Sequence, residues 1–177
     1  MVQNETRWLY LKPFTQTKEF LHLADISRQL KEPHPTVRKY LNSFEKEGLL
    51  IKDIKGRLTL FKLNRDHPLI IDYLTIIEKE VLIKRCKKNL IINEIVSNCH
   101  IGNTLIFGSA SNSNKFNDID LLTTSEINKT NIEEKINKKI HIIKVKSLNE
   151  VNNSLKNEIF KKHLIINGSE EIIKWLL

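Results

Sequence analysis

The spacing of apolar residues predicts two helices and a hairpin in the first third of the chain. Residues 17–30 place their apolar side chains on one helical stripe, and residues 35–47 repeat that spacing. The intervening "KEPHP" ends the first helix because its prolines cannot continue it, whereas a proline is favoured in the first turn of the next. Two β-rich runs then flank Lys55-Gly56, which predicts a tight hairpin turn.

Apolar residues continue at helical spacing through the middle of the chain. Residues 69–98 contain no glycine or proline, which predicts one long helix or two abutting helices. Such a stripe packs either against a second copy of the chain, giving a homodimer, or against the next domain. The basic cluster of Lys84, Arg85, Lys87 and Lys88 is expected on a solvated face.

Two carboxylates interrupt an apolar run in the last third of the chain. "LIFGS" predicts a strand that ends at Gly108-Ser109, and "DIDLL" predicts a second strand eight residues later. Successive side chains of a strand point to opposite faces, so Asp118 and Asp120 share a face and Ile119 takes the other. At a separation of about 5 Å the carboxylates repel by roughly 3 kcal/mol. A hard divalent cation would offset this repulsion, because Mg²⁺ prefers oxygen ligands.

The net charge of +8 is concentrated near the start of the chain. Residues 1–66 hold 13 Lys and Arg against 8 Asp and Glu, whereas residues 101–177 hold 11 against 9. This excess favours a polyanionic partner, most simply a nucleic acid. The alternative is that surplus lysine only keeps the surface soluble.

The phrase "TVRKYLNSFEKEGLL" resembles the recognition-helix segment of the winged helix-turn-helix superfamily, and the resemblance covers residues 5–65. It implies that duplex DNA is a partner and that the second helix enters the major groove. The residues implied to contact base edges or phosphates from this helix are Thr36, Arg38 and Lys39. Those implied to contact phosphates from the wing are Lys52, Lys55, Arg57 and Lys62. The alternative is a winged helix used for dimerisation or protein contacts.

The run "LIFGS…NDIDLL" resembles the nucleotidyltransferase superfamily typified by DNA polymerase beta, over residues 90–177. It is most similar to minimal nucleotidyltransferases of archaea and bacteria, and its fusion to a winged helix resembles an archaeal architecture. The resemblance implies that Gly108 and Ser109 bind the phosphates of a nucleoside triphosphate. It implies that Asp118 and Asp120 are catalytic and bind Mg²⁺ or Mn²⁺. The family's basic residue early in the loop is missing, and Lys115 is the candidate substitute.

A third carboxylate of active family members has no counterpart here. The expected strand is "KIHIIKVK", with His141 at the expected position and no Asp or Glu between Lys135 and Leu148. Imidazole is a poorer ligand than carboxylate for Mg²⁺, although it is acceptable to Mn²⁺. His141 is therefore either a third site residue or an ordinary strand histidine. Nucleotide binding would persist in this site while transfer becomes slow or absent.

These patterns predict an α+β protein of two domains, with a DNA-binding domain at 1–66, a connecting helical segment at 67–99 and a nucleotidyltransferase-like domain at 100–177. The expected function is metal-dependent nucleotide binding with transfer to a hydroxyl of protein or RNA. The alternative is a non-catalytic transcriptional regulator or antitoxin-like repressor. We expect a cytoplasmic protein without a membrane partner, because no apolar run approaches about 20 residues and residues 1–10 show no secretory signal. Cys86 and Cys99 are expected to be free thiols.

Overall fold

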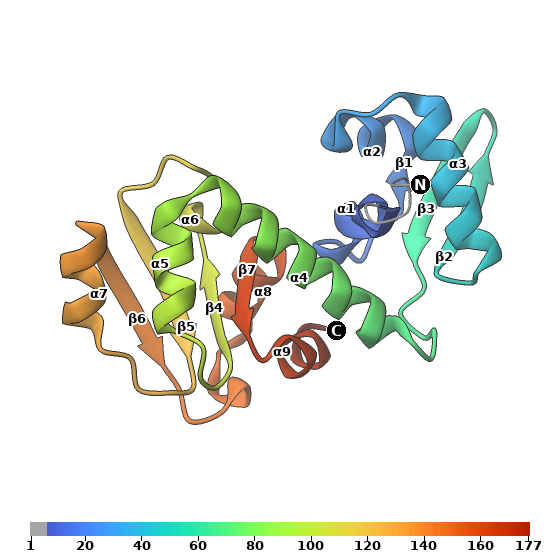
Figure 1. Ribbon diagram of the computed structural model, residues 1–177. Helices are drawn as coiled ribbons and strands as arrows, with labels where there is room; N and C mark the ends of the chain where they lie inside the picture. Colours follow the sequence, from blue (N-terminus) through green and yellow to red (C-terminus); the bar gives the residue numbers. More distant parts are fainter. Residues whose placement is uncertain (1–6) are drawn as a thin grey trace. The chain divides into compact units, whose positions relative to one another are not determined.

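The computed structural model describes residues 7–177 and shows a mixed α and β protein (Figure 1). The first six residues of the predicted DNA-binding domain, which also belong to the segment searched for a secretory signal, lie outside the described residues. The chain divides into two compact units, Met1–Ile77 and Glu78–Leu177. We describe each unit by itself.

Short helices and one antiparallel sheet make up the first unit. In chain order its elements are η1 (Arg7–Leu11), α1 (Lys12–Thr15), β1 (Leu21–His22), α2 (Leu23–Leu30), α3 (His34–Lys46), β2 (Leu50–Lys55) and β3 (Leu58–Leu63). The strands pair in the order β1-β3-β2. The fully buried side chains beneath them include Leu11, Phe14, Ile26, Val37, Leu41, Phe44, Leu49 and Phe61.

The first predicted helix begins later than the sequence pattern indicates. A helix over residues 17–30 was expected, but α2 starts at Leu23. The preceding residues form β1, in which Leu21 pairs with Phe61 of β3. The ring of His22 accepts a hydrogen bond from the Ala24 amide (3.2 Å between Nδ1 and N), which caps the helix at this point. The second helix and the hairpin form as predicted.

The second unit is a four-stranded sheet with helices. Helix α4 (Ile70–Lys88) contributes residues to both units. The elements that follow it are α5 (Leu90–Asn98), β4 (Thr104–Phe107), α6 (Ser109–Asn112), β5 (Asp118–Thr123), α7 (Lys129–Ile136), β6 (Lys139–Lys144), η2 (Leu148–Glu150), α8 (Asn153–Lys161), β7 (His163–Asn167) and α9 (Ser169–Leu176). The strand order is β6-β5-β4-β7; β5 runs parallel to β6, whereas β4 is antiparallel to both its neighbours.

The middle segment forms two helices because Asn89 interrupts it. Asn89 has an extended backbone, and its side chain accepts hydrogen bonds from the amides of Ile91 and Ile92, at 3.0 and 3.2 Å. Such a cap favours the start of a new helix. Of the two expected arrangements, the structure has two abutting helices. Among residues 7–177, no helix is long and apolar enough to cross a membrane.

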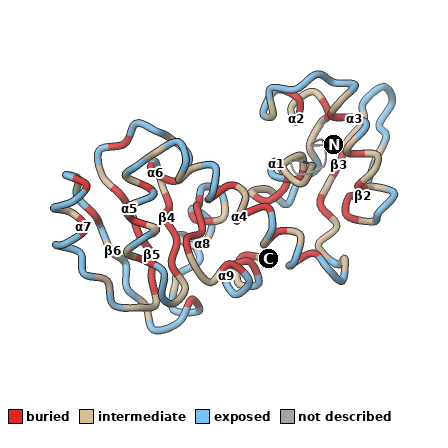
Figure 2. The backbone as a smooth tube through the Cα atoms, in the orientation of Figure 1, coloured by how far each residue is buried: buried red, intermediate tan, exposed pale blue. Residues whose placement is uncertain are grey.

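The central strands of the second unit carry its core (Figure 2). Strand β4 is buried along its whole length, and the far end of β5 is buried as well. The fully buried side chains here include Ile92, Ile95, Leu105, Ile106, Ile119, Leu121, Leu122, Ile140, Ile159, Leu164 and Ile165. Asp118 and Asp120, at the start of β5, are only half-buried, so they lie at the edge of this apolar core.

Candidate functional site

Gly108 joins β4 to α6 with a backbone that side chains rarely tolerate. Its φ is +66° and its ψ is −147°, a region occupied almost exclusively by glycine. A Cβ atom at this position would lie 2.9 Å from Oδ2 of Asp120. Gly108 was expected to let the backbone approach a phosphate. In the structure, the group that lies close to Gly108 is the carboxylate of Asp120.

Asp118 and Asp120 lie on the same face of β5, with Ile119 between them fully buried on the other. Their side chains are 47% and 32% exposed, so both reach solvent. The neighbouring strand places His141 directly opposite Asp120. The Nδ1 atom of His141 lies 3.3 Å from Oδ1 of Asp120 and 4.0 Å from Oδ2 of Asp118. The imidazole therefore stands beside both carboxylates, as the position of His141 in the sequence suggested.

These three side chains do not by themselves make up a metal site. Among residues 7–177, no group of three or more His, Cys, Asp or Glu side chains is arranged to hold a metal ion. Two neighbouring carboxylates nevertheless fit the chemistry of Mg²⁺, which is commonly held by one or two carboxylates and keeps phosphate or water oxygens as its other ligands. The donors present thus suit a cation that arrives with a nucleotide.

A cavity of about 460 Å³ opens beside Asp118. Ser109, Lys115 and Lys138 line it together with Asp118 and the loop residues Asn114, Phe116 and Asn117. Two predicted nucleotide-binding residues, Ser109 and Lys115, therefore meet one predicted metal ligand at this cavity. Lys138 was not among the residues predicted for this site. Its position directly before the strand that carries His141 was the signal that could have found it.

Arg85 holds the loop that forms this cavity. Its Nη1 donates to Oδ1 of Asn114 (2.6 Å), and its Nη2 donates to the carbonyl oxygens of Ala110 (3.0 Å) and Ser113 (2.6 Å). Burial lowers the pKa of the guanidinium below its usual range. The expectation that Arg85 belongs to a solvated basic face is therefore wrong, because the loop folds back onto α4 and accepts its hydrogen bonds.

A buried ionisable pair lies further along the same sheet. His163 pairs with Phe107 across the sheet, and Phe107 pairs with Asp120 on its other side. The Nε2 atom of His163 lies 3.5 Å from Oε1 of Glu78, and Nδ1 lies 2.8 Å from the carbonyl oxygen of Ile159. These contacts join α4, α8 and β7, so the pair positions elements of the fold.

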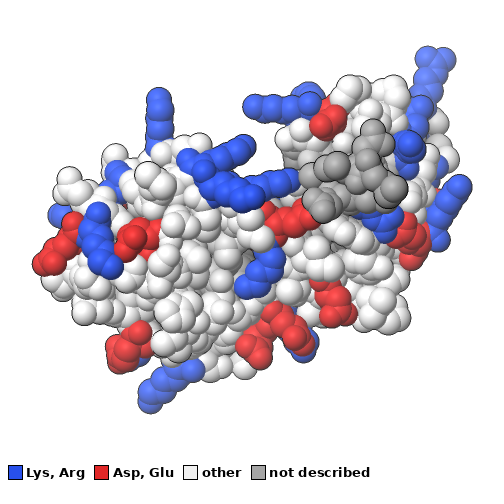
Figure 3. Space-filling model, in the orientation of Figure 1, with Lys and Arg blue, Asp and Glu red and all other residues white. Residues whose placement is uncertain are grey.

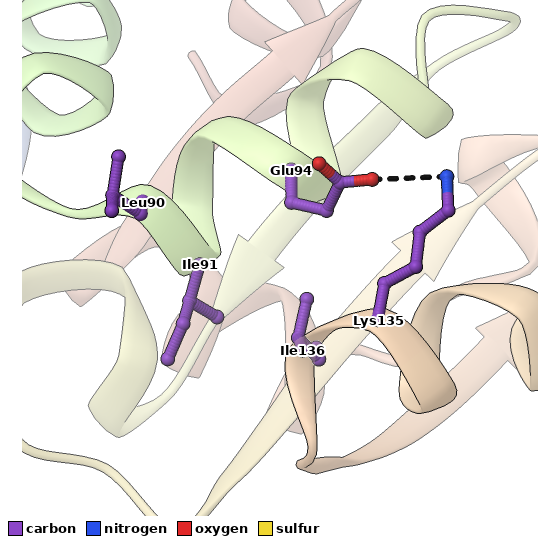
Figure 4. A pocket seen from close by; sticks show the side chains of 5 residues that line it. All are labelled: Leu90, Ile91, Glu94, Lys135 and Ile136. Atoms are coloured by element: carbon purple, nitrogen blue, oxygen red, sulfur yellow. Dashed lines mark ion pairs between the residues drawn. The ribbon is translucent and has the colours of Figure 1, made fainter.

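A larger cavity, of about 560 Å³, lies away from the carboxylate pair (Figure 4). Leu90, Ile91 and Glu94 of α5 line it together with Lys135 and Ile136 of α7. Lys135 lies 3.1 Å from Oε1 of Glu94, and hydrogen bonds from Lys135 and then Asn98 lower the pKa of the Glu94 carboxyl. Because this ion pair satisfies the charges that line it, the cavity offers less for a nucleotide than the one beside Asp118.

The predicted DNA-binding residues are mostly exposed. Arg38 and Lys39 of α3 are exposed and Thr36 is half-buried, while Lys55 and Arg57 are exposed at the hairpin turn. Two further contacts link the hairpin to its surroundings: Lys52 of β2 donates to Oδ1 of Asn42 on α3 (3.2 Å), and Lys62 lies over the ring of Phe20. Figure 3 shows Lys and Arg side chains projecting from both parts of the chain, with Asp and Glu among them. Charge by itself therefore does not locate a nucleic-acid interface.

Comparison with known proteins identifies no relative of this chain. No family model, no curated protein and no solved structure matches the chain. The residues and their geometry are therefore the basis for inferring a function.

Proposed function

We propose that the second unit is a nucleotidyltransferase-like domain that binds a nucleoside triphosphate together with a divalent cation. The observation that carries this proposal is the pair of solvent-reaching carboxylates on one face of β5, with Gly108 against one of them and a lysine-lined cavity beside the other. Two neighbouring carboxylates at this spacing have little structural use, since each raises the electrostatic energy of the other.

In this site Asp118 and Asp120 would hold Mg²⁺ or Mn²⁺, and Ser109 and Lys115 would contact the phosphates. The cation, when bound, neutralises phosphate charge and polarises the phosphoryl group. Gly108 leaves the space that the Asp120 carboxylate needs, and Arg85 keeps the loop of Ser109 against the fold. A transferred nucleotidyl group would go to a hydroxyl of protein or RNA.

Calorimetry with Mg²⁺ and ATP tests this proposal. The unmodified protein should bind ATP in the presence of Mg²⁺ and should lose that binding in the presence of a chelator. The double variant Asp118→Asn with Asp120→Asn should lose the metal-dependent part while remaining folded. The matched control is Glu126→Gln with Glu170→Gln, which removes the same charge from exposed positions. Equal affinity in the carboxylate variant, or in the chelator, would contradict the proposal.

We propose further that the first unit is a winged helix-turn-helix that binds duplex DNA. Support comes from the order α2, α3, β2, β3 and from the exposed Arg38 and Lys39 on α3. The hydrogen bond from Lys52 to Asn42 ties the hairpin to α3, so helix and hairpin can present their basic side chains as one surface. Arg38 and Lys39 would reach base edges or phosphates, and Lys55 and Arg57 would contact phosphates.

One observation favours a second candidate, a non-catalytic regulator that keeps the nucleotide site as a sensor. His141, not a carboxylate, faces Asp120 from β6, and its Nδ1–H can donate a hydrogen bond to that carboxylate. This arrangement supplies fewer anionic ligands than a second cation requires. The regulator would bind nucleotide with the same metal dependence but would show no transfer of labelled nucleotide to protein or RNA.

A further inference from the structure

Lys138 is fixed at the wall of the cavity beside Asp118. It lies between Asn137, the left-handed residue that ends α7, and Lys139, the first residue of β6. Its ammonium donates a hydrogen bond to the carbonyl oxygen of Phe116, with 2.8 Å between Nζ and O. The same ammonium lies 5.4 Å from the centroid of the Phe116 ring. These two contacts restrict an otherwise flexible side chain, and an ammonium with three N–H donors still has two of them free for a ligand.

The surroundings of Lys138 suit an anion with several oxygens. Ser109 provides a hydroxyl and Lys115 a second ammonium at the same cavity, which Asp118 also lines. Within residues 7–177, neither Lys115 nor Lys138 makes an ion pair with a carboxylate. The backbone at Lys115 is itself held by Ser113, whose Oγ donates to its carbonyl (2.9 Å) and accepts from its amide (3.0 Å).

An aromatic base is a poorer occupant of this cavity than a phosphate chain. Phe116 is only 7% exposed, and the Lys138 ammonium stands over its ring. The ring therefore has little free face on which a base could stack. Besides the Asp118 carboxylate and two asparagine amides, the cavity wall offers two ammonium groups and a hydroxyl, which are groups that bind phosphate.

We propose that Lys138 binds the terminal phosphates of the nucleotide, alongside Ser109 and Lys115 at the same cavity. This inference rests on the proposed nucleotide binding of the second unit. It also sets the orientation of the bound nucleotide, because the phosphate chain would run from the cation at Asp118 and Asp120 toward Lys138. The base would then lie outside the cavity and contribute less to affinity than the phosphates do.

The test compares Mg²⁺-dependent binding of ATP and of AMP by calorimetry. The variants are Lys138→Met and Lys138→Gln; both remove the charge, and Gln keeps an N–H donor for the Phe116 carbonyl. We expect ATP affinity to fall about 10- to 100-fold in each variant, the range of a hydrogen bond to a charged group, and AMP affinity to change by less than about threefold. Lys138→Arg should retain most of the ATP affinity. The matched control, Lys144→Met, removes a lysine that pairs with Glu126 at the opposite end of β6 and should bind as the unmodified protein does.

The possible results distinguish a failure of the Lys138 role from a failure of the proposed nucleotide binding. If the unmodified protein binds no ATP with Mg²⁺, both are wrong. If the Asp118→Asn, Asp120→Asn variant loses ATP while both neutral Lys138 variants bind it normally, the proposed function stands and the role of Lys138 is refuted. Equal losses of ATP and AMP in the Lys138 variants would also refute it, because Lys138 would then act on a part that both nucleotides share (the base, the sugar or the α-phosphate) or on the fold.

Discussion

Replacing Arg85 with Met should loosen the loop that follows Gly108 and weaken the second unit. Met keeps much of the apolar stem of Arg85 but removes the guanidinium and its three hydrogen bonds to Asn114, Ala110 and Ser113. Residues 110–114 would then lose these hydrogen bonds to α4. We expect both the free energy of unfolding and the affinity for nucleotide to fall.

The magnitude follows from what the guanidinium gains and what its burial costs. Hydrogen bonds from a charged donor are worth about 1.5–3 kcal/mol each, so three of them set an upper bound of about 9 kcal/mol. Removing the guanidinium from water offsets several kcal/mol of this sum. The lowered pKa of Arg85 reports that desolvation, and its buried Nε has no hydrogen-bond partner among the described residues. Asn114 is exposed and can turn to water, whereas the buried Ala110 has less access to it. We expect a net loss of about 2–3 kcal/mol in the free energy of unfolding.

Urea denaturation followed by tryptophan fluorescence measures this loss. The chain has two tryptophans, Trp8 in the first unit and Trp175 in the second. A Trp8→Phe background therefore lets the signal report the second unit. The matched control is Lys84→Met, an exposed neighbour whose loss should change the free energy of unfolding by less than about 0.5 kcal/mol.

Two outcomes would refute the reasoning about Arg85. One is an Arg85→Met protein as stable as the Lys84→Met control, which would mean that desolvation cancels the three hydrogen bonds. The other is full stability in Arg85→Lys, because a single ammonium cannot reproduce the planar, forked donor geometry of a guanidinium. If the loop does carry Ser109 to the nucleotide, Arg85→Met should also weaken ATP binding while leaving DNA binding unchanged.

Three further predictions concern other parts of the chain. Arg38→Ala with Lys39→Ala should weaken DNA binding in a mobility-shift titration and flatten its salt dependence, since fewer counterions are released; unchanged binding would exclude these residues from the interface. His141→Asp should strengthen the binding of Mn²⁺ with ATP and raise the transfer of labelled nucleotide, because it adds a third carboxylate beside the pair; if both stay at the level of the unmodified protein, His141 is an ordinary strand residue. At pH 8 Cys86 should react with a thiol reagent well before Cys99, because Cys99 is buried and burial raises its pKa to about 11, so little thiolate forms below that pH; equal rates in the folded protein would contradict the burial of Cys99.

The alternation of side chains along β5 was readable from the sequence because a strand has a fixed period of two. That period predicted that Asp118 and Asp120 share a face and that Ile119 takes the other, and the structure buries Ile119. The place of His141 was expected from the resemblance to the nucleotidyltransferase superfamily, in which a later strand carries a third site residue, and in the structure His141 lies directly opposite Asp120. Local periodicity therefore sufficed for the two carboxylates, whereas the place of His141 depended on the resemblance.

The contacts made by loops could not be read in the same way. Spacing along α4 placed Arg85 among lysines, and nothing in that pattern shows that residues 110–114 fold back to accept its hydrogen bonds. The place of Lys138 directly before the strand of His141 was readable, but its contact with the Phe116 carbonyl depends on how the loop folds, which spacing does not show. The start of α2 was misplaced because pairing of Leu21 with Phe61 of β3 competes with helix formation at that point.

A crystal structure of the protein grown with Mn²⁺ and a non-hydrolysable ATP analogue tests the central claim most directly, because the anomalous signal of manganese locates the cation. The proposal predicts a manganese ion bound by Asp118 and Asp120, with phosphate oxygens completing its ligands and the terminal phosphate at Lys138. Analogue and manganese bound elsewhere, for example in the cavity between α5 and α7, or carboxylates that remain free at saturating concentrations of both, would contradict it.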